Sequence, residues 1–442
     1  MANNAVKYSQ PAGYQELNSS QGNRLAIGVV STLFFLFGFI TCLNDILIPH
    51  LKEVFALSYT ESMLINLLFF GAYFVFSLPA SKLITKIGYK NSFIVGLLLT
   101  AIGCFSFVFA AKIAIYYVFL CGLFVLASGV VTLQVASNPY LTIISTPKNA
   151  SSTLIFAQGL NSLGTTLAPI LGSSLILAVA VLPADVLQNM SQQEIANYHV
   201  AQAYSVQKPY LYLACSAILI AIIMSFFKYP KDRVQERTVK AKHQIQDAAS
   251  IEKFNIFNYP KLVLGTIAIF VYVGAEVGIG SLMVNYISQS HVGNFDLKTA
   301  GFLVTLYWGA AMVGRFIGFY FALKKPTHKI LFFHAIMALF LVTCTIFGSG
   351  YFAIVCVLAV GFFNSIMFPS IFVLSTQGLG KFVEKGSGII CMAIVGGAVI
   401  PMLQGIIADN LSLNASYIVP LLCYLYIAWF AMKVKSEVSL KH

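Results

Sequence analysis

The sequence predicts an all-α membrane protein with twelve transmembrane helices in two pseudo-symmetric six-helix bundles. The first observation is composition: 58% of the 442 residues are apolar and only 10% are charged, whereas soluble domains average about 45–50% and about 25%. The second is the number of apolar residues, because a membrane span needs about 20 of them and the chain holds enough for about twelve spans. The third is a polar stretch that divides the apolar runs six and six. This pattern excludes an ordinary water-soluble enzyme and argues against nucleic acid as a partner.

Each predicted helix is an apolar run bounded by short polar loops. The runs lie at about 25–49, 61–82, 91–111, 114–141, 151–182, 208–228, 260–289, 299–323, 329–348, 351–377, 386–408 and 414–433. The first run is too long for a signal peptide and has no small-residue cleavage pattern, so we expect it to stay as a span. The longest interior polar stretch, 228–261, follows the sixth run. The predicted parts are a cytoplasmic tail (1–24), an N-terminal bundle (25–228), a cytoplasmic linker (229–259), a C-terminal bundle (260–433) and a second cytoplasmic tail (434–442).

The distribution of basic residues predicts the orientation. With both termini in the cytoplasm, all of the 27 basic residues except Lys52, Lys112, Lys208 and Lys298 fall on the cytoplasmic side. Basic loops stay cytoplasmic in multi-span proteins. The segment 183–207 then becomes an external loop, to which the sequence assigns no role.

Prolines recur at matching positions in the two halves. Pro139 ends the fourth run and Pro169 interrupts the fifth, while Pro369 ends the tenth and Pro401 interrupts the eleventh. Proline removes a backbone donor, and membrane helices tolerate this where a neighbour or a cavity can satisfy the freed carbonyl. The recurrence indicates an internal repeat of the kind found in transporters, although each proline taken alone could simply shape a packed helix.

Two acids fall inside the predicted spans, Asp45 in the first and Glu276 in the seventh; the others fall in loops, tails or helix ends. A charge at mid-membrane costs at least about 2.5–3.5 kcal/mol, so such residues normally face a cavity and serve a function. The first and seventh spans are equivalent elements of the two halves, so both acids are expected to face one central cavity. A lone buried carboxyl group there could bind and release a proton as access alternates. The alternative is a neutral acid hydrogen-bonded within the packing.

The other intramembrane polar groups are mostly amides, which offer both donors and acceptors for sugar hydroxyls and carry no net charge. Gln158 and Asn161 are three residues apart and so share a helix face. Hydrogen bonding between helices is an equally good explanation for any single amide. The candidate substrate-binding residues are Asn44, Gln134, Gln158, Asn161, Asn285 and Trp308.

Three further groups receive separate interpretations. Trp308 lies inside the eighth span and could stack on a sugar ring, whereas Trp429 is expected to anchor the last span at the interface. Arg315 lies toward the cytoplasmic end of the eighth span and, with Lys86, is expected to act as a gate or as a loop ion-pair partner. The eight cysteines lie singly in apolar stretches with no metal-binding spacing, so we expect them only to pack.

Several motifs together resemble the fucose–galactose–glucose:cation symporter family of the major facilitator superfamily. They are LNDILIPHL (43–51), GYK (88–90), ASNPY (136–140), QGLNSLG (158–164), YVGAEVGIGSLMVNY (272–286) and GRFIG (314–318). The resemblance implies the major facilitator fold, a sugar site between the halves and proton coupling at Asp45. The fucose permease has an acid where this chain has Gln134 and a glutamine where it has Glu276, so the pattern is closer to the glucose/galactose branch.

The sequence therefore predicts a bacterial inner-membrane carrier that imports a neutral hexose, glucose or galactose, by H⁺ or Na⁺ symport. Asp45 is the main expected ion-coupling group, Glu276 assists coupling or accepts sugar hydroxyls, and both are possible oxygen ligands for Na⁺. No cofactor is expected, the partners are a monosaccharide and the lipid bilayer, and we expect a monomer. An L-fucose or amino-sugar proton symporter, or an efflux carrier of another small neutral solute, is the alternative. An enzyme is not expected, because His334 is the only intramembrane histidine and has no acid nearby in sequence.

Overall fold

The structure is a computed structural model that describes residues 20–54, 59–113, 115–176, 207–227, 254–295 and 297–434, with a few positions between 190 and 198. Helices make up almost all of these residues. The α-helices are α1 (Ser20–Val54), α2 (Tyr59–Ile113), α3 (Tyr116–Ile144), α4 (Ala150–Ile176), α7 (Gln207–Phe226), α9 (Pro260–Ile287), α10 (Leu297–Lys324), α11 (Thr327–Phe347), α12 (Gly350–Asn364), α13 (Met367–Thr376), α14 (Val383–Met392), α15 (Gly396–Asn410), α16 (Leu413–Ser416) and α17 (Ile418–Lys433). Short 3₁₀ turns are η2 (Ile256–Asn258), η3 (Gly380–Phe382) and η4 (Ala393–Val395).

These helices make twelve membrane crossings, as the sequence predicted. Within the described residues, ten segments are long and apolar enough to span a bilayer, and one of them, Leu67–Ala110, has 44 residues. That segment lies in α2, which is two helices joined at Gly88, where φ is 80°. The 27 residues of α4 supply the remaining crossing. The pairs α12–α13 and α14–α15 are each one bent span.

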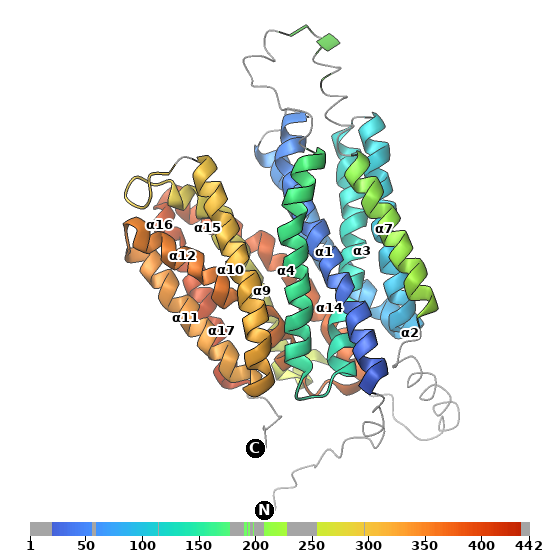
Figure 1. The fold of residues 1–442 in the computed structure, drawn as a ribbon. Helices are drawn as coiled ribbons and strands as arrows, with labels where there is room; N and C mark the ends of the chain where they lie inside the picture. Colours follow the sequence, from blue (N-terminus) through green and yellow to red (C-terminus); the bar gives the residue numbers. More distant parts are fainter. Residues whose placement is uncertain are drawn as a thin grey trace, which may run out of the picture.

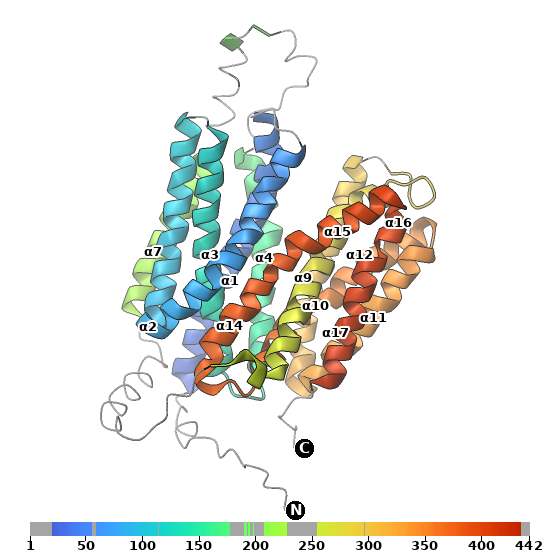
Figure 2. The ribbon, with the colours of Figure 1, turned by 180° about the vertical axis from the view of Figure 1, so that it is seen from behind.

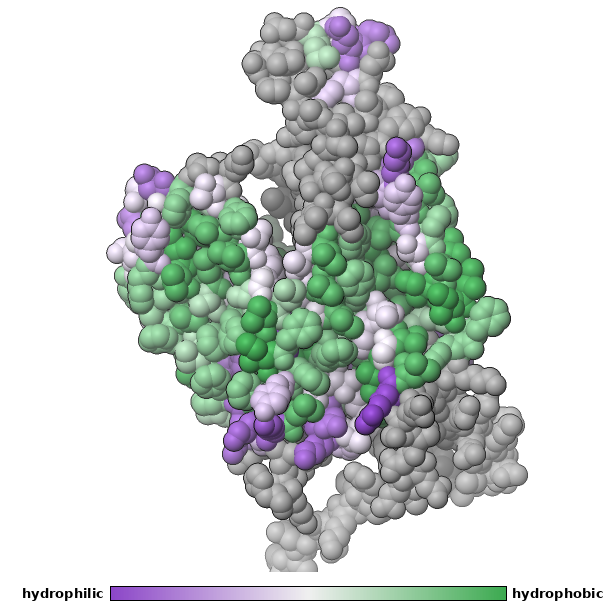
Figure 3. Space-filling model, in the orientation of Figure 1, coloured by the Kyte–Doolittle hydropathy of each residue, from purple (hydrophilic) through white to green (hydrophobic). Residues whose placement is uncertain are grey.

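The crossings form two bundles, α1 to α7 and α9 to α17 (Figures 1 and 2). α1 starts and α17 ends at the same end of the molecule, the lower end in Figure 1, and the opposite end is called the upper end here. Figure 3 shows a wide apolar surface between polar groups at the two ends. Since apolar side chains are stable against lipid and charged ones are not, this belt is the surface that the bilayer covers.

Glycines allow close approach of helices inside the N-terminal bundle. A Cβ at Gly103 would lie 2.4 Å from the backbone nitrogen of Leu126, and one at Gly129 would lie 2.4 Å from that of Thr100. In a membrane no hydrophobic effect draws helices together, so small residues stabilise them by permitting tight packing. The arm of α2 that follows Gly88 is joined to α3 in this way.

The recurring prolines free backbone carbonyls that other helices then bind. A helical N–H at position i bonds the carbonyl at i−4, so Pro139 leaves the carbonyl of Val135 free and Pro369 leaves that of Ser365 free. The Ser387 hydroxyl donates to the Val135 oxygen at 2.8 Å, from the other bundle. The Arg315 Nε donates to the Ser365 oxygen at 3.3 Å. Neighbouring side chains therefore satisfy both carbonyls, as expected for interrupted membrane helices.

Two surfaces join the bundles, and we name them seams. The α4–α10 seam is formed by Ile155, Phe156, Gly159, Phe316 and Phe319 with their neighbours: the rings of Phe156 and Phe319 are 5.7 Å apart, and a Cβ at Gly159 would lie 3.2 Å from the Phe316 ring. Because α4 starts and α10 ends at the lower end, this seam lies in the lower part of the molecule (Figure 1).

The α2–α14 seam is formed by Tyr89, Glu384, Ser387 and Gly388 with their neighbours. The Tyr89 hydroxyl donates to Glu384 Oε1 at 2.7 Å, and a Cβ at Gly388 would lie 2.7 Å from that of Ser81. It also lies toward the lower end, since Tyr89 follows the fold of α2 at Gly88. The bundles diverge toward the upper end (Figure 2).

Candidate functional site

The described intramembrane acid is Glu276, near the middle of α9. Its side chain is 13% exposed, and its Oε1 has no hydrogen-bond partner among the described residues. The nearest cationic group is Arg315 of α10, whose Nη2 lies 3.9 Å from that oxygen. A buried carboxylate with a free lone pair and one loosely placed counter-charge can accept a proton, a cation or a ligand hydroxyl.

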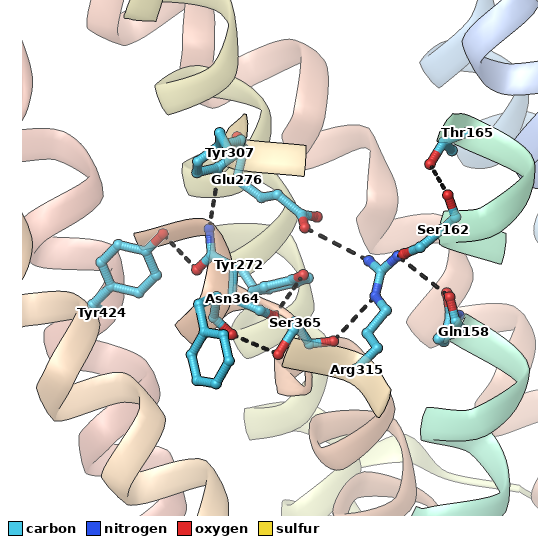
Figure 4. Close-up of polar contacts among 11 residues, drawn as sticks. Gln158, Ser162, Thr165, Tyr272, Glu276, Tyr307, Arg315, Asn364, Ser365 and Tyr424 are labelled. Atoms are coloured by element: carbon cyan, nitrogen blue, oxygen red, sulfur yellow. Dashed lines mark hydrogen bonds and ion pairs between the residues drawn. The ribbon is translucent and has the colours of Figure 1, made fainter. Parts of the chain in front are cut away.

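Arg315 is the hub of the site (Figure 4). Besides its ion pair with Glu276, its Nη1 donates to the backbone oxygen of Gln158 at 3.3 Å and to the Ser162 hydroxyl, both on α4 of the other bundle. Its Nε bonds the Ser365 carbonyl that Pro369 leaves free. Arg315 was predicted to be a gate or a loop ion-pair partner. Its ion-pair partner is an intramembrane acid rather than a loop residue, because Arg315 lies nine positions before Lys324, about 13.5 Å along the helix axis from the lower end of α10.

A polar network behind Glu276 supports it from inside the C-terminal bundle (Figure 4). The Tyr307 hydroxyl donates to the backbone oxygen of Glu276 at 3.3 Å and accepts from the Asn364 amide at 2.8 Å. The Tyr424 hydroxyl donates to the Asn364 side-chain oxygen at 2.7 Å, and that of Tyr272 to the Asn364 carbonyl at 3.2 Å. The amide of Asn364 has a partner at each end, so this network fixes the position of α9 rather than offering free groups.

The sequence did not identify Asn364 or Ser162 as site residues. Asn364 is an intramembrane amide that lies just before the break between α12 and α13. Its position shortly before Pro369 in the sequence was the feature that could have indicated a site residue. Ser162 carried no signal, because most helical serines bond to their own backbone.

The two predicted amides of α4 take different positions. Gln158 contacts the site through its backbone oxygen, and its side chain is half-buried. The Asn161 amide donates to the Phe34 backbone oxygen of α1 at 3.0 Å. Asn161 is thus engaged in joining α4 to α1, the alternative that the sequence left open for any single amide.

Trp308 lies close to Glu276. A Cβ at Gly280, one turn from Glu276 on the same face of α9, would lie 3.2 Å from Trp308 Cζ2. Trp308 is also seven residues before Arg315, so the two share a face of α10. The indole is 39% exposed, and on this face Met312 contacts Thr166 of α4. The tryptophan therefore borders the space between the bundles, above Arg315.

None of the remaining predicted positions makes a described contact with this group. Asn285 is exposed and nine residues from Glu276, about half a turn around α9, so the structure does not bring them together. Gln134 of α3 is half-buried, and its side chain has no hydrogen bond to the described residues. Lys86 is exposed at the lower end of α2.

Asn44 and Asp45 belong to α1, but their side chains lie outside the described residues. Among the residues that are described, no group of three or more metal-binding side chains comes together. None of the eight cysteines, all of which are described, forms a disulfide.

Comparisons with known proteins identify the family to which the chain belongs. Residues 29–393 match the Major Facilitator Superfamily. The glucose/galactose transporter of Brucella abortus is 45% identical over 419 residues, covering 95% of this chain and 96% of that protein. The chain belongs to the major facilitator superfamily. Within it, the chain belongs with the fucose, galactose and glucose symporters, because the L-fucose-proton symporter of Escherichia coli is 30% identical over 98% of each chain.

The solved structures agree with this family. A crystal structure of the superfamily transporter FucP in the outward conformation superposes with a TM-score of 0.84 at 29% identity, covering 94% of this chain and 99% of that one. The relatives are named as transporters, which confirms the prediction of a carrier rather than an enzyme. The two bundles of this superfamily member meet at one end and diverge at the other (Figures 1 and 2).

Proposed function

We propose that this protein imports a neutral hexose, glucose or galactose, by symport with a cation. The observation that supports this most is the buried Glu276–Arg315 pair between the two bundles of a chain that is 45% identical to a glucose/galactose transporter. A carboxylate is retained inside a membrane at a cost, so a role in carrying charge is a reason for its presence. Rocking of the bundles about this site would supply alternating access.

The site residues have separate proposed roles. Asp45 is the main ion-coupling group, and Glu276 assists it or accepts sugar hydroxyls. Gln134 and Gln158 offer side-chain amides toward the sugar, and Trp308 offers a ring face. Asn44, Asn161 and Asn285 are weaker candidates, Asn161 because its amide already binds the Phe34 carbonyl.

The orientation and the coupling ion are also part of the proposal. We place the lower end, where α1 starts and α17 ends, in the cytoplasm of a bacterial cell and the protein in the inner membrane as a monomer, so the structure is outward-facing. Both termini are then proposed to be cytoplasmic. The coupling ion is H⁺ or Na⁺, since two carboxylates and amide oxygens suit either.

Counterflow in proteoliposomes tests the substrate. The vesicles are loaded with unlabelled sugar and the entry of labelled glucose, galactose, L-fucose and an amino sugar is measured. We expect glucose and galactose to exchange at least about tenfold faster than L-fucose, the factor given by about 1.4 kcal/mol of discrimination. The same vesicles with separately imposed H⁺ and Na⁺ gradients identify the ion. Exchange of L-fucose alone, or of no sugar, would contradict the proposal.

A further inference from the structure

Arg315 supplies the polar contacts that cross the α4–α10 seam. The other described contacts of that seam join apolar groups, such as the rings of Phe156 and Phe319, or involve the Met312 sulfur. The Arg315 Nη1, in contrast, bonds the Gln158 carbonyl and the Ser162 hydroxyl of α4. Separation of α4 from α10 must break these two bonds.

The same guanidinium has its counter-charge in its own bundle. Arg315 is only 11% exposed, and Glu276 is the acid within ion-pair distance of it among the residues that the structure describes. Among the described residues, the other titratable groups around the pair are the hydroxyls of Tyr272 on α9, Tyr307 on α10 and Tyr424 on α17, and the groups of α4 that contact Arg315 are the neutral Gln158 carbonyl and Ser162 hydroxyl. Loss of the Glu276 charge would therefore leave a buried cation without compensation, which is strongly destabilising.

We propose that Arg315 converts cation loading at Glu276 into opening of the α4–α10 seam at the lower end. A proton or Na⁺ on Glu276 removes the counter-charge of Arg315. Separation of α4 from α10 then exposes the guanidinium to water, which replaces the lost interaction. Arg315 acts as a positioning residue, because it senses the acid on one side and holds the partner bundle on the other. The inference rests on the proposed function in taking Glu276 as an ion-coupling group.

A distance measurement across the seam tests this. Spin labels are attached at Lys148→Cys and Lys325→Cys, exposed positions at the lower ends of α4 and α10, in a background without the native cysteines. Pulsed electron resonance then gives the distance distribution in liposomes without sugar. Glu276→Gln imitates the loaded state, and we expect it to raise the ratio of long to short distances about tenfold, because the buried Arg315 cation loses its counter-charge.

The decisive measurement is the distance distribution of the double variant that combines Glu276→Gln with Arg315→Gln. If Glu276 acts on the seam through Arg315, Arg315→Gln alone widens the distribution and Glu276→Gln adds nothing to it, whereas independent effects would add. Arg24→Gln, the same change at an exposed position at the start of α1, is the control and should leave the distribution unchanged. If Arg315→Gln does not yield folded protein, Arg315→Lys replaces it: lysine keeps the charge, so Glu276→Gln should still widen the distribution.

Three results would overturn the inference. The first is a wild-type distance distribution in Glu276→Gln, and the second is an equal widening of the distribution by Glu276→Gln in the presence and absence of Arg315. The third is a distance distribution in the Arg315→Lys variant that Glu276→Gln does not widen. None of these readouts uses a sugar. Failure to find a transported hexose would therefore count against the proposed function and leave the result on the seam intact.

Discussion

The two seams between the bundles are built from different contacts. In the α2–α14 seam, a Cβ at Gly388 would lie 2.9 Å from the Ser77 backbone oxygen, so two backbones approach each other directly. In the α4–α10 seam, the group nearest to Gly159 is the ring edge of Phe316, which can rotate. Backbone cannot move as cheaply as a side chain, so the α2–α14 seam is the more rigid of the two.

The polar contacts of the two seams also differ in their relation to the Glu276–Arg315 pair. In the α2–α14 seam, the bond from Ser387 to the Val135 carbonyl satisfies a backbone group, and the Tyr89–Glu384 bond lies toward the lower end, away from the intramembrane pair. In the α4–α10 seam the polar group is Arg315, which also contacts Glu276. Both seams close the lower end, but among the described residues the α4–α10 seam is the one that contacts the intramembrane Glu276–Arg315 pair.

Among the substitutions that distinguish the two seams, Gly388→Ala is expected to have the largest effect on the stability of a closed seam. The added methyl group meets the Ser77 carbonyl and the Ser81 Cβ, so the closed seam should lose about 1–3 kcal/mol, as for overpacked cores. Spin labels at Lys86→Cys and Lys385→Cys would show a larger fraction of long distances. Gly405→Ala, where nothing lies within 4 Å of the new methyl group, is the matched control. A wild-type distribution in Gly388→Ala would show that this seam is not rigid.

A smaller effect is expected from Ser387→Ala. The change removes the donor to the Val135 carbonyl, which Pro139 has already deprived of its helical partner, and should destabilise the closed seam by about 1 kcal/mol. The same pair of labels measures it. Ser216→Ala, at an exposed serine of α7 that bonds its own helix, should have no effect. Equal results for the two serines would mean that the Val135 carbonyl finds another partner.

The smallest effect is expected from Gly159→Ala. The Phe316 ring can move away by a few tenths of an ångström, so the closed α4–α10 seam should change by less than about 0.5 kcal/mol. Labels at Lys148→Cys and Lys325→Cys measure this. A shift as large as that of Gly388→Ala would remove the distinction between the seams.

Much of the fold followed from the sequence because a membrane imposes a simple rule on it. Each crossing needs about 20 apolar residues, so the runs could be counted. The prolines marked the bent spans α12–α13 and α14–α15 of the C-terminal half, but in the N-terminal half the predicted interruptions were wrong, because α3 and α4 each continue unbroken through the matching positions. The two arms of α2, joined at Gly88, were correctly predicted as separate spans. Hydropathy also placed Glu276 in the membrane interior.

The partners within the site did not follow, because hydropathy gives the depth of a residue and not its rotation about the helix. Asn285 and Glu276 share a helix yet point to opposite sides, and Asn161 turns to the Phe34 carbonyl. Arg315 was expected to be a gate or a loop ion-pair partner, and its long side chain reaches an intramembrane acid and the second bundle instead of a loop residue. The contacts of Asn364 depend on which tyrosines surround it, and no local pattern encodes that.

The most direct test of cation-coupled transport is sugar accumulation by Asp45→Asn in proteoliposomes. The substitution keeps the shape of the side chain and removes its capacity to carry a proton or to hold a cation by charge. We expect gradient-driven accumulation to be lost while exchange of labelled hexose continues, and Asp409→Asn, at an exposed acid of α15, to accumulate sugar normally. Full accumulation by Asp45→Asn would contradict the account.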